Sequence, residues 1–120
     1  MPRLILDESK IHSSIRQSVS DNHLDIVEEA MKAIGANAVV VIGMGQNPEC
    51  KKARKALSSK GIEHKYLEYG NYLNSWRRRN ALKMWTGWPT FPMIFVDGIL
   101  IGGNSDLADL VNKGELDQLL

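Results

Sequence analysis

Runs of apolar residues, separated by glycine, proline and asparagine, divide the chain into expected strands and helices. Four runs have the pattern of β-strands: residues 38–42, 64–69, 93–96 and 99–101. The first run is continuous and β-branched, which is typical of a strand buried on both faces of a sheet. Asp97 and Gly98 separate the last two runs and favour a tight hairpin between them. The pattern therefore predicts four strands, of which the last two are antiparallel.

Apolar residues at helical spacing occupy most of the chain between these strands. Helices are expected between Leu24 and Gly35, Asn47 and Gly61, Leu73 and Gly87, and Asn104 and Gly114, with a last short turn in residues 115–120. Asp21 or Asn22 is the expected N-cap of the first of these helices, whereas Asn47 and Pro48 begin the second. A strand, a helix and another strand in this order imply a right-handed parallel crossover.

The order of the elements predicts an α/β fold, with a four-stranded mixed sheet flanked by helices. Residues 23–120 are expected to form this domain. Residues 1–22 are expected to be an N-terminal helical extension, because Ile11, Ile15 and Val19 recur every four residues.

Composition and charge narrow the classes of function and location. The net charge of +1 favours neither a nucleic-acid partner nor a membrane surface, although Arg77, Arg78 and Arg79 form a local basic run. One cysteine cannot make an intramolecular disulfide, which suits a reducing compartment. We expect no metal site from one cysteine and three scattered histidines, and neither a leader nor a membrane span, so the expected location is cytoplasmic.

Cys50 lies one turn into the expected second helix and is the first residue with candidate chemistry. Free N–H groups at a helix start favour the thiolate, which is the reactive form of cysteine. Lys51 and Lys52 add positive charge nearby. The alternative, a small buried apolar residue without chemistry, is at least as well supported by spacing alone.

Two further segments have features of a ligand site. Phe91-Pro92 is a candidate for a cis bond, which would leave the Phe91 N–H and C=O available to an extended peptide. Glycines at 102 and 103 allow close approach of a ligand, the helix start behind them suits a carboxylate, and Asp106 suits an ammonium group. The alternatives are a rigid loop and a capped turn.

These segments, in this order, resemble the glutaredoxin family over residues 38–120. Residues 88–92, followed by 94–98 and 102–103, are similar to monothiol glutaredoxins, whereas residues 102–107 are similar to dithiol ones. The resemblance implies a thioredoxin-like fold and a groove for glutathione. The residues implied in glutathione binding are Arg79, Thr90, Phe91, Pro92, Gly103, Ser105 and Asp106.

The resemblance also implies a role for several of these residues. Pro92 would be the cis-proline, and the main chain of Phe91 would pair with the cysteinyl part of glutathione. Ser105 and Asp106 would hold its γ-glutamyl end, and Arg79 would meet its glycine carboxylate, which suits an arginine fork.

The active-site turn departs from the family pattern. Asn47-Pro48-Glu49-Cys50 stands where the family has Cys-x-x-Cys, so Asn47 replaces the nucleophilic cysteine and Cys50 takes the resolving position. Asparagine can neither form a mixed disulfide nor act as a thiolate ligand of an iron–sulfur cluster.

Three functions therefore remain open at the level of sequence. The first is a glutathione-dependent thiol–disulfide oxidoreductase that works through Cys50 alone, possible because free glutathione can resolve a mixed disulfide. The second is a non-catalytic module that binds glutathione or glutathionylated proteins, and the third is an iron–sulfur carrier. The expected state is a monomer or a weak dimer.

Overall fold

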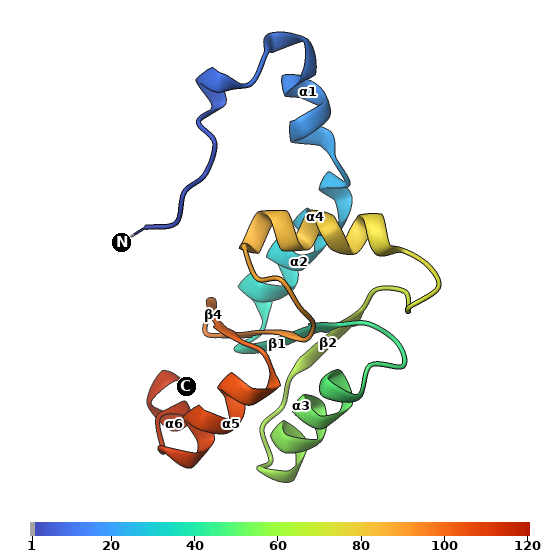
Figure 1. The fold of residues 1–120 in the computed structure, drawn as a ribbon. Helices are drawn as coiled ribbons and strands as arrows, with labels where there is room; N and C mark the ends of the chain where they lie inside the picture. Colours follow the sequence, from blue (N-terminus) through green and yellow to red (C-terminus); the bar gives the residue numbers. More distant parts are fainter. Residues whose placement is uncertain (1) are drawn as a thin grey trace.

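The computed structural model describes residues 2–120 and shows a mixed sheet with helices on both faces (Figure 1). The strands are β1 (Val39–Gly43), β2 (Lys65–Glu68), β3 (Met93–Val96) and β4 (Ile99–Gly102). Their order across the sheet is β2-β1-β3-β4, with β2 parallel to β1 and the other two pairs antiparallel. The expected α/β architecture is confirmed, including the parallel crossover and the final hairpin.

Two layers of helices cover the sheet. Helices α2 (Leu24–Ala36) and α4 (Trp76–Thr86) pack on one face. Helices α3 (Pro48–Ser59), α5 (Asn104–Asn112) and α6 (Leu116–Leu119) pack on the other. The central strand β1 sends Val40 and Ile42 to the first layer and Val39 and Val41 to the second, and all four side chains are buried. This explains why its sequence is continuously apolar.

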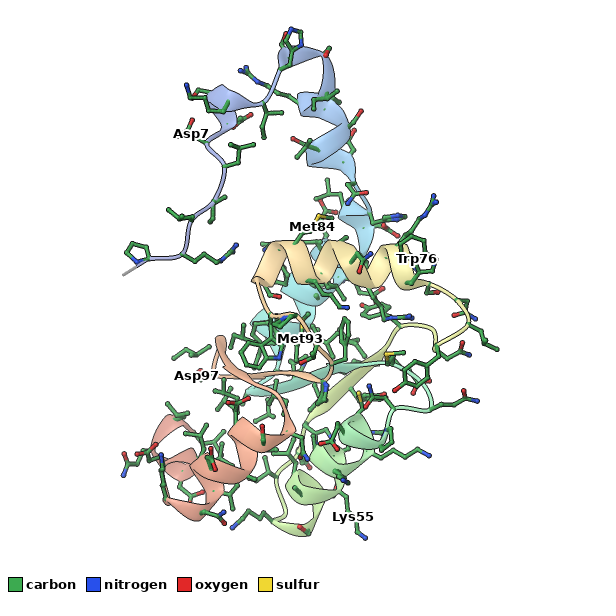
Figure 2. The ribbon with its side chains drawn as sticks, viewed as in Figure 1. Asp7, Lys55, Trp76, Met84, Met93 and Asp97 are labelled. Carbon is green, nitrogen blue, oxygen red and sulfur yellow. The ribbon has the colours of Figure 1, made fainter. Side chains whose placement is uncertain are left out.

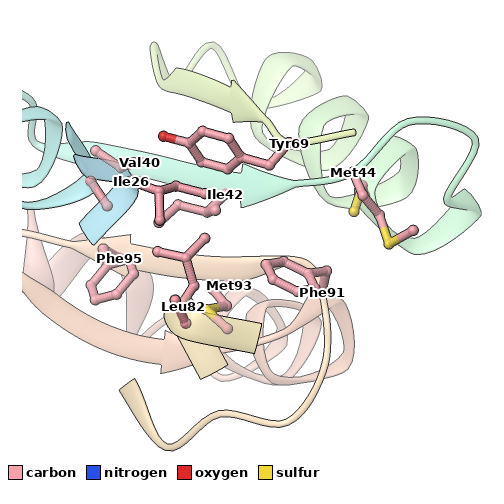
Figure 3. Close-up of a cluster of buried hydrophobic side chains, with 12 residues drawn as sticks. Ile26, Val40, Ile42, Met44, Tyr69, Leu82, Phe91, Met93 and Phe95 are labelled. Atoms are coloured by element: carbon pink, nitrogen blue, oxygen red, sulfur yellow. The ribbon is translucent and has the colours of Figure 1, made fainter. Parts of the chain in front are cut away.

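The α2/α4 side of the core contains the bulkier cluster, and Figure 3 shows its side chains beside the strands. Its labelled members are Ile26, Val40, Ile42, Met44, Tyr69, Leu82, Phe91, Met93 and Phe95. Phe91 belongs to this cluster with 8% of its surface exposed. The segment that carries the candidate ligand contacts is therefore fixed to the core by its own side chain.

The start of α2 differs from the expectation. Its N-cap is His23, in a left-handed conformation with φ +48° and without a side-chain cap, whereas Asp21 and Asn22 belong to the end of the preceding helix α1 (Ser13–Asp21). Asp21 is the last residue of α1 and Asn22 is its C-cap, so neither residue is placed to cap α2. Gly35 also does not stop α2, which continues to Ala36.

Helix α4 begins three residues later than the apolar spacing predicted. Leu73 lies in the preceding turn, where its N–H donates to Asn71 Oδ1 over 2.8 Å, and 89% of its surface is exposed. Gly87 ends the helix as expected, with φ +78°.

Residues 2–22, which we call the arm, extend from the α2/α4 side of the molecule (Figure 1). The arm contains a short 3-10 helix, η1 (Glu8–Lys10), and α1. The expected helix in this region is confirmed, but all nine residues of α1 are exposed. Among residues 2–120, helices are too short or too polar to cross a bilayer.

Candidate functional site

Three segments that are distant in sequence meet at one hollow, which we call the site groove. The groove has a volume of about 280 Å³, and its lining comes from the first turn of α3, the loop before β3 and the start of α5. Its lining residues are Glu49, Trp88, Thr90, Phe91, Pro92, Gly103, Asn104, Ser105 and Asp106. Six of the seven residues expected to bind glutathione therefore lie together, and Arg79 does not.

The loop before β3 presents free main-chain groups to the groove. The Phe91-Pro92 bond is cis. Within residues 2–120, the Phe91 N–H and C=O make no main-chain hydrogen bond. The sheet register begins one residue after Pro92, where Met93 pairs with Ile42. An extended ligand main chain has both a donor and an acceptor available here.

The start of α5 forms the opposite wall. Asp106 Oδ2 accepts a hydrogen bond from the Gly103 N–H over 2.9 Å and so caps the helix. Ser105 is exposed, and the first residues of the helix line the groove. Asp106 thus has a structural role in addition to the ammonium contact that was expected of it.

Cys50 points away from the groove into the core. Only 1% of its surface is exposed, and its Sγ lies against Gly43 and the Tyr66 ring. Burial raises the pKa of the thiol, and the nearby carboxylates of Glu68 and Glu49 raise it further, while a Met44 amide hydrogen bond opposes them. Of the two alternatives left open by the sequence, the geometry favours the buried apolar residue.

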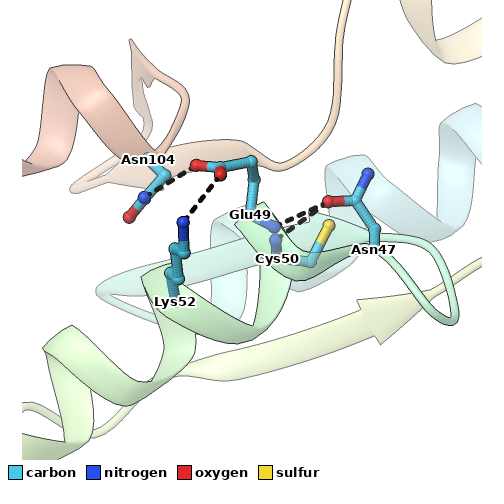
Figure 4. Close-up of polar contacts among 5 residues, drawn as sticks. All are labelled: Asn47, Glu49, Cys50, Lys52 and Asn104. Carbon is cyan, nitrogen blue, oxygen red and sulfur yellow. Dashed lines mark hydrogen bonds and ion pairs between the residues drawn. The ribbon is translucent and has the colours of Figure 1, made fainter.

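Asn47 and Glu49 have clear structural partners (Figure 4). Asn47 Oδ1 accepts from the Glu49 and Cys50 N–H groups over 2.9 and 3.2 Å, which caps α3. Glu49 accepts from Asn104 Nδ2 over 2.9 Å and pairs with Lys52 Nζ at 3.2 Å. The Asn104 hydrogen bond, followed by Lys52, lowers the pKa of Glu49. A fixed carboxylate therefore joins α3 to α5 along the groove.

Arg79 departs from its expected position. It is 6% exposed, and its Nη1 donates to the carbonyl oxygens of Tyr69 at 3.0 Å and Asn74 at 2.6 Å. Arg78 pairs with Asp25 at 2.9 Å, so the three arginines do not act as one basic patch. The cause is the helical turn: consecutive residues of α4 point in different directions, and Arg79 points inward.

One group that lines the groove, and one near the Phe91 ring, were not among the expected ligand contacts. In the described part of the chain, the buried Trp88 Nε1 has no hydrogen-bond partner, and it lies 3.8 Å from the Cβ position of Gly103. Lys83 Nζ lies 5.7 Å from the centre of the Phe91 ring. Trp88 was visible in the sequence as part of a motif, but its unpaired donor was not. Lys83 has no signal beyond its place in a helix.

Comparisons with known proteins agree with this architecture. The family model described as Glutaredoxin matches residues 39–101. A glutaredoxin-like protein of Dictyostelium discoideum is 43% identical over 108 residues, covering 90% of this chain and 88% of that protein. The mitochondrial monothiol glutaredoxin of Arabidopsis thaliana is 30% identical, over 95% of this chain and 67% of that protein.

A solved structure supplies the comparison of folds. The buckwheat glutaredoxin–glutathione complex superposes with a TM-score of 0.71 over 83% of this chain and 91% of that one, at 21% identity. This similarity confirms the thioredoxin-like fold. Together with the family match and the relatives, it leads to one conclusion: the chain belongs to the glutaredoxin family.

Proposed function

We propose that the chain binds glutathione, or the glutathionyl group of a modified protein, in the site groove without turnover through Cys50. The observation that carries this proposal is the unpaired polar main chain of Phe91 facing the start of α5 across one hollow. The buckwheat relative of the same fold was solved as a complex with glutathione. Membership of the glutaredoxin family supports a thiol-related function. The geometry of the groove favours binding of glutathione over its turnover.

The groove offers partners for several polar parts of an extended tripeptide. The Phe91 N–H and C=O would pair with the ligand main chain as a neighbouring strand does. The free amides at the start of α5, near Ser105, would hold a carboxylate. A buried donor without a partner costs about 1–3 kcal/mol, so an acceptor placed at Trp88 Nε1 would remove that cost.

In the part of the chain that the structure describes, the site groove has no thiol placed for thiol–disulfide exchange. Asn47 stands where the resemblance places the family nucleophile, and its side chain already caps α3. Cys50 is buried, and its raised pKa keeps it protonated at neutral pH. An oxidoreductase acting through Cys50 would have to open the first turn of α3 to expose the sulfur.

An iron–sulfur cluster does not fit the donor set either. Among residues 2–120, no group of three or more His, Cys, Asp or Glu could hold a metal ion. The thiol of Cys50 faces Gly43 in the core. The similarity to a monothiol glutaredoxin is therefore not matched by ligands in this chain.

Calorimetric titration with reduced glutathione tests the binding proposal. Ser105→Glu adds a negative charge at the start of α5, where it favours the helix but repels a ligand carboxylate. We expect the dissociation constant to rise at least about tenfold. Ala108→Glu is the matched control, because residue 108 is exposed on the same helix and does not line the groove, and its affinity should equal that of the native chain. Equal affinity of Ser105→Glu, or no binding by the native chain, would contradict the proposal.

Turnover is tested separately by disulfide reduction with glutathione as the donor. The native chain and Cys50→Ser should both give the uncatalysed rate. A native rate clearly above that of Cys50→Ser would show that the thiol acts, and would replace the binding proposal with the oxidoreductase.

A further inference from the structure

The arm carries apolar side chains that the rest of the chain does not cover. Leu4, Ile5 and Leu6 are consecutive, and 91%, 70% and 67% of their surfaces are exposed. Farther along the arm, Ile15 and Val19 form a stripe on α1 with 50% and 52% exposed. Three consecutive apolar side chains with this much exposed surface indicate an interaction surface.

A second hollow lies beside the arm, and its lining residues differ from those of the site groove. This hollow, which we call the arm groove, has a volume of about 570 Å³ and lies between α1, α2 and α4. Its main apolar walls are Ile15, Val19, Leu24, Val27, Met84 and Trp85. Figure 2 shows Met84 on the side of α4 that faces the arm. Of the described residues that line the arm groove, none carries a formal charge.

The Leu4–Leu6 segment is held outside the arm groove of its own chain at both of its ends. At one end, the Arg3 side chain lies on Gly87, close enough that an added Cβ there would be 2.8 Å from Arg3 Nε. At the other end, Asp7 accepts a hydrogen bond from the Ser9 N–H over 2.8 Å and caps η1. The three apolar side chains between these anchors are therefore presented outward in a fixed, extended segment.

We propose that the arm groove receives residues 4–6 of a second copy of this chain, and that the exchange is reciprocal. The lining of the arm groove is uncharged, and so is the apolar run at residues 4–6 of the arm. Arg3 and Asp7 flank this run, so only its three residues match the groove. A net charge of +1 opposes association only weakly. Removing apolar side chains from water stabilises association in proportion to the area buried, and a two-fold dimer would bury two such segments.

This dimer is independent of the proposed glutathione site. The arm groove and the site groove share none of their described lining residues. The site groove would stay open in the dimer, so glutathione binding and association should neither require nor exclude each other.

Sedimentation velocity of the full chain, from micromolar to millimolar concentration, tests the proposal. The native chain should pass from monomer to dimer within this range. Ile5→Asp in the arm and Met84→Asp in the arm groove should each raise the dimer dissociation constant at least about tenfold. Leu73→Asp is the matched control, since Leu73 is 89% exposed outside both surfaces, and it should associate like the native chain.

A mixture of the two variants distinguishes arm exchange from other contacts. The Met84→Asp variant keeps an intact arm, and the Ile5→Asp variant keeps an intact arm groove. In a mixed dimer, the intact arm can enter the intact groove, so one of the two contacts is retained. The mixture should associate more strongly than either variant alone. Circular dichroism and the unfolding midpoint will show that both variants fold, and Leu4→Ser provides a second, milder arm variant.

Three outcomes would overturn the proposal. The native chain could remain monomeric at every concentration, Ile5→Asp or Met84→Asp could associate like the native chain, or the mixture could associate no better than its components. The last outcome would indicate that α1 and α4 faces pack directly against each other rather than exchanging arms.

Discussion

At the scale of single residues, Gly43 and Cys50 fit together as a pair. Gly43 ends β1 at the place where the first turn of α3 packs on the sheet, and its bare Cα leaves room for the Cys50 sulfur. The Tyr66 ring closes the same space from β2. The position of the only thiol of the chain is therefore set by packing rather than by contact with a ligand.

A side chain at residue 43 should disturb this packing. In Gly43→Ala, the new Cβ would lie 2.8 Å from Cys50 Sγ and 3.0 Å from the Tyr66 ring, so the variant should lose about 1–3 kcal/mol of unfolding free energy. Denaturant unfolding measures the loss. Gly35→Ala is the control: its Cβ would meet no atom within 4 Å, and removing a helical glycine should not destabilise the protein. Equal effects of the two substitutions would contradict this account.

The buried thiol should respond to pH in a defined direction. Because burial raises the pKa of Cys50, labelling by a thiol reagent should be slow at neutral pH in the folded protein and fast in denaturant. The folded state favours the protonated thiol, so its contribution to stability is complete below the ordinary pKa of cysteine and is lost as pH rises through the raised value.

Comparison with Cys50→Ala isolates this contribution, since that variant should lose less stability between neutral and alkaline pH. Labelling of the folded native chain as rapid as in denaturant would show that the sulfur is accessible, against the structure.

At the scale of elements, Arg79 connects α4 to the loop that follows β2. Its guanidinium donates to the Tyr69 and Asn74 carbonyl oxygens and so fixes the turn between Tyr69 and Ser75. The same turn contacts the loop before α3 through the Gly45 N–H, which donates to the Gly70 carbonyl oxygen over 2.7 Å. One buried cation thus positions both loops at the carboxyl ends of β1 and β2.

Loss of this cation should cost stability. A hydrogen bond from a charged donor contributes about 1.5–3 kcal/mol to stability. Arg79→Ala should therefore lower the unfolding free energy by about 1.5–3 kcal/mol or more. Arg77→Ala is the matched control on the same helix, where the side chain is exposed, and it should change stability by less than about 0.5 kcal/mol. If Arg79→Ala left stability unchanged and weakened glutathione binding instead, the ligand role implied by the family resemblance would be restored.

The contact between α3 and α5 can be measured through Glu49. Because the Asn104 hydrogen bond is the largest cause of the lowered pKa of Glu49, Asn104→Ala should raise that pKa toward its ordinary value. Lys52→Ala should raise it by less. NMR titration of the Glu49 side-chain carbon follows both variants. A Glu49 pKa that responds to Lys52 but not to Asn104 would show that the two helix starts are not joined in solution.

At the scale of the whole molecule, the sheet and most of its helices were predictable from local sequence. A few neighbouring residues were enough to predict each of three features: the strand β1, the hairpin turn at Asp97-Gly98 and the start of α3 at Asn47-Pro48. The structure confirms all three. The segments that line the site groove were also predictable as a set, because their order and spacing resemble one family.

The remaining features depend on contacts between distant segments. The inward direction of Arg79 is set by the carbonyl oxygens of another loop, and the start of α2 at His23 follows from where α1 ends. The burial of Cys50 depends on Gly43 and Tyr66, which lie in two different strands. Spacing along the chain carries no information about these partners, so the sequence left the role of the thiol open and did not predict the two carbonyl contacts of Arg79.

The strand order has a consequence for solubility. In the order β2-β1-β3-β4, β2 is an edge strand with unpaired backbone groups, and its ends carry the exposed charged residues Lys65 and Glu68. Charged side chains on a short edge oppose the addition of another strand. The β2 edge of the sheet is thereby protected against the addition of a further strand, whereas the opposite edge strand, β4, carries no charged residue.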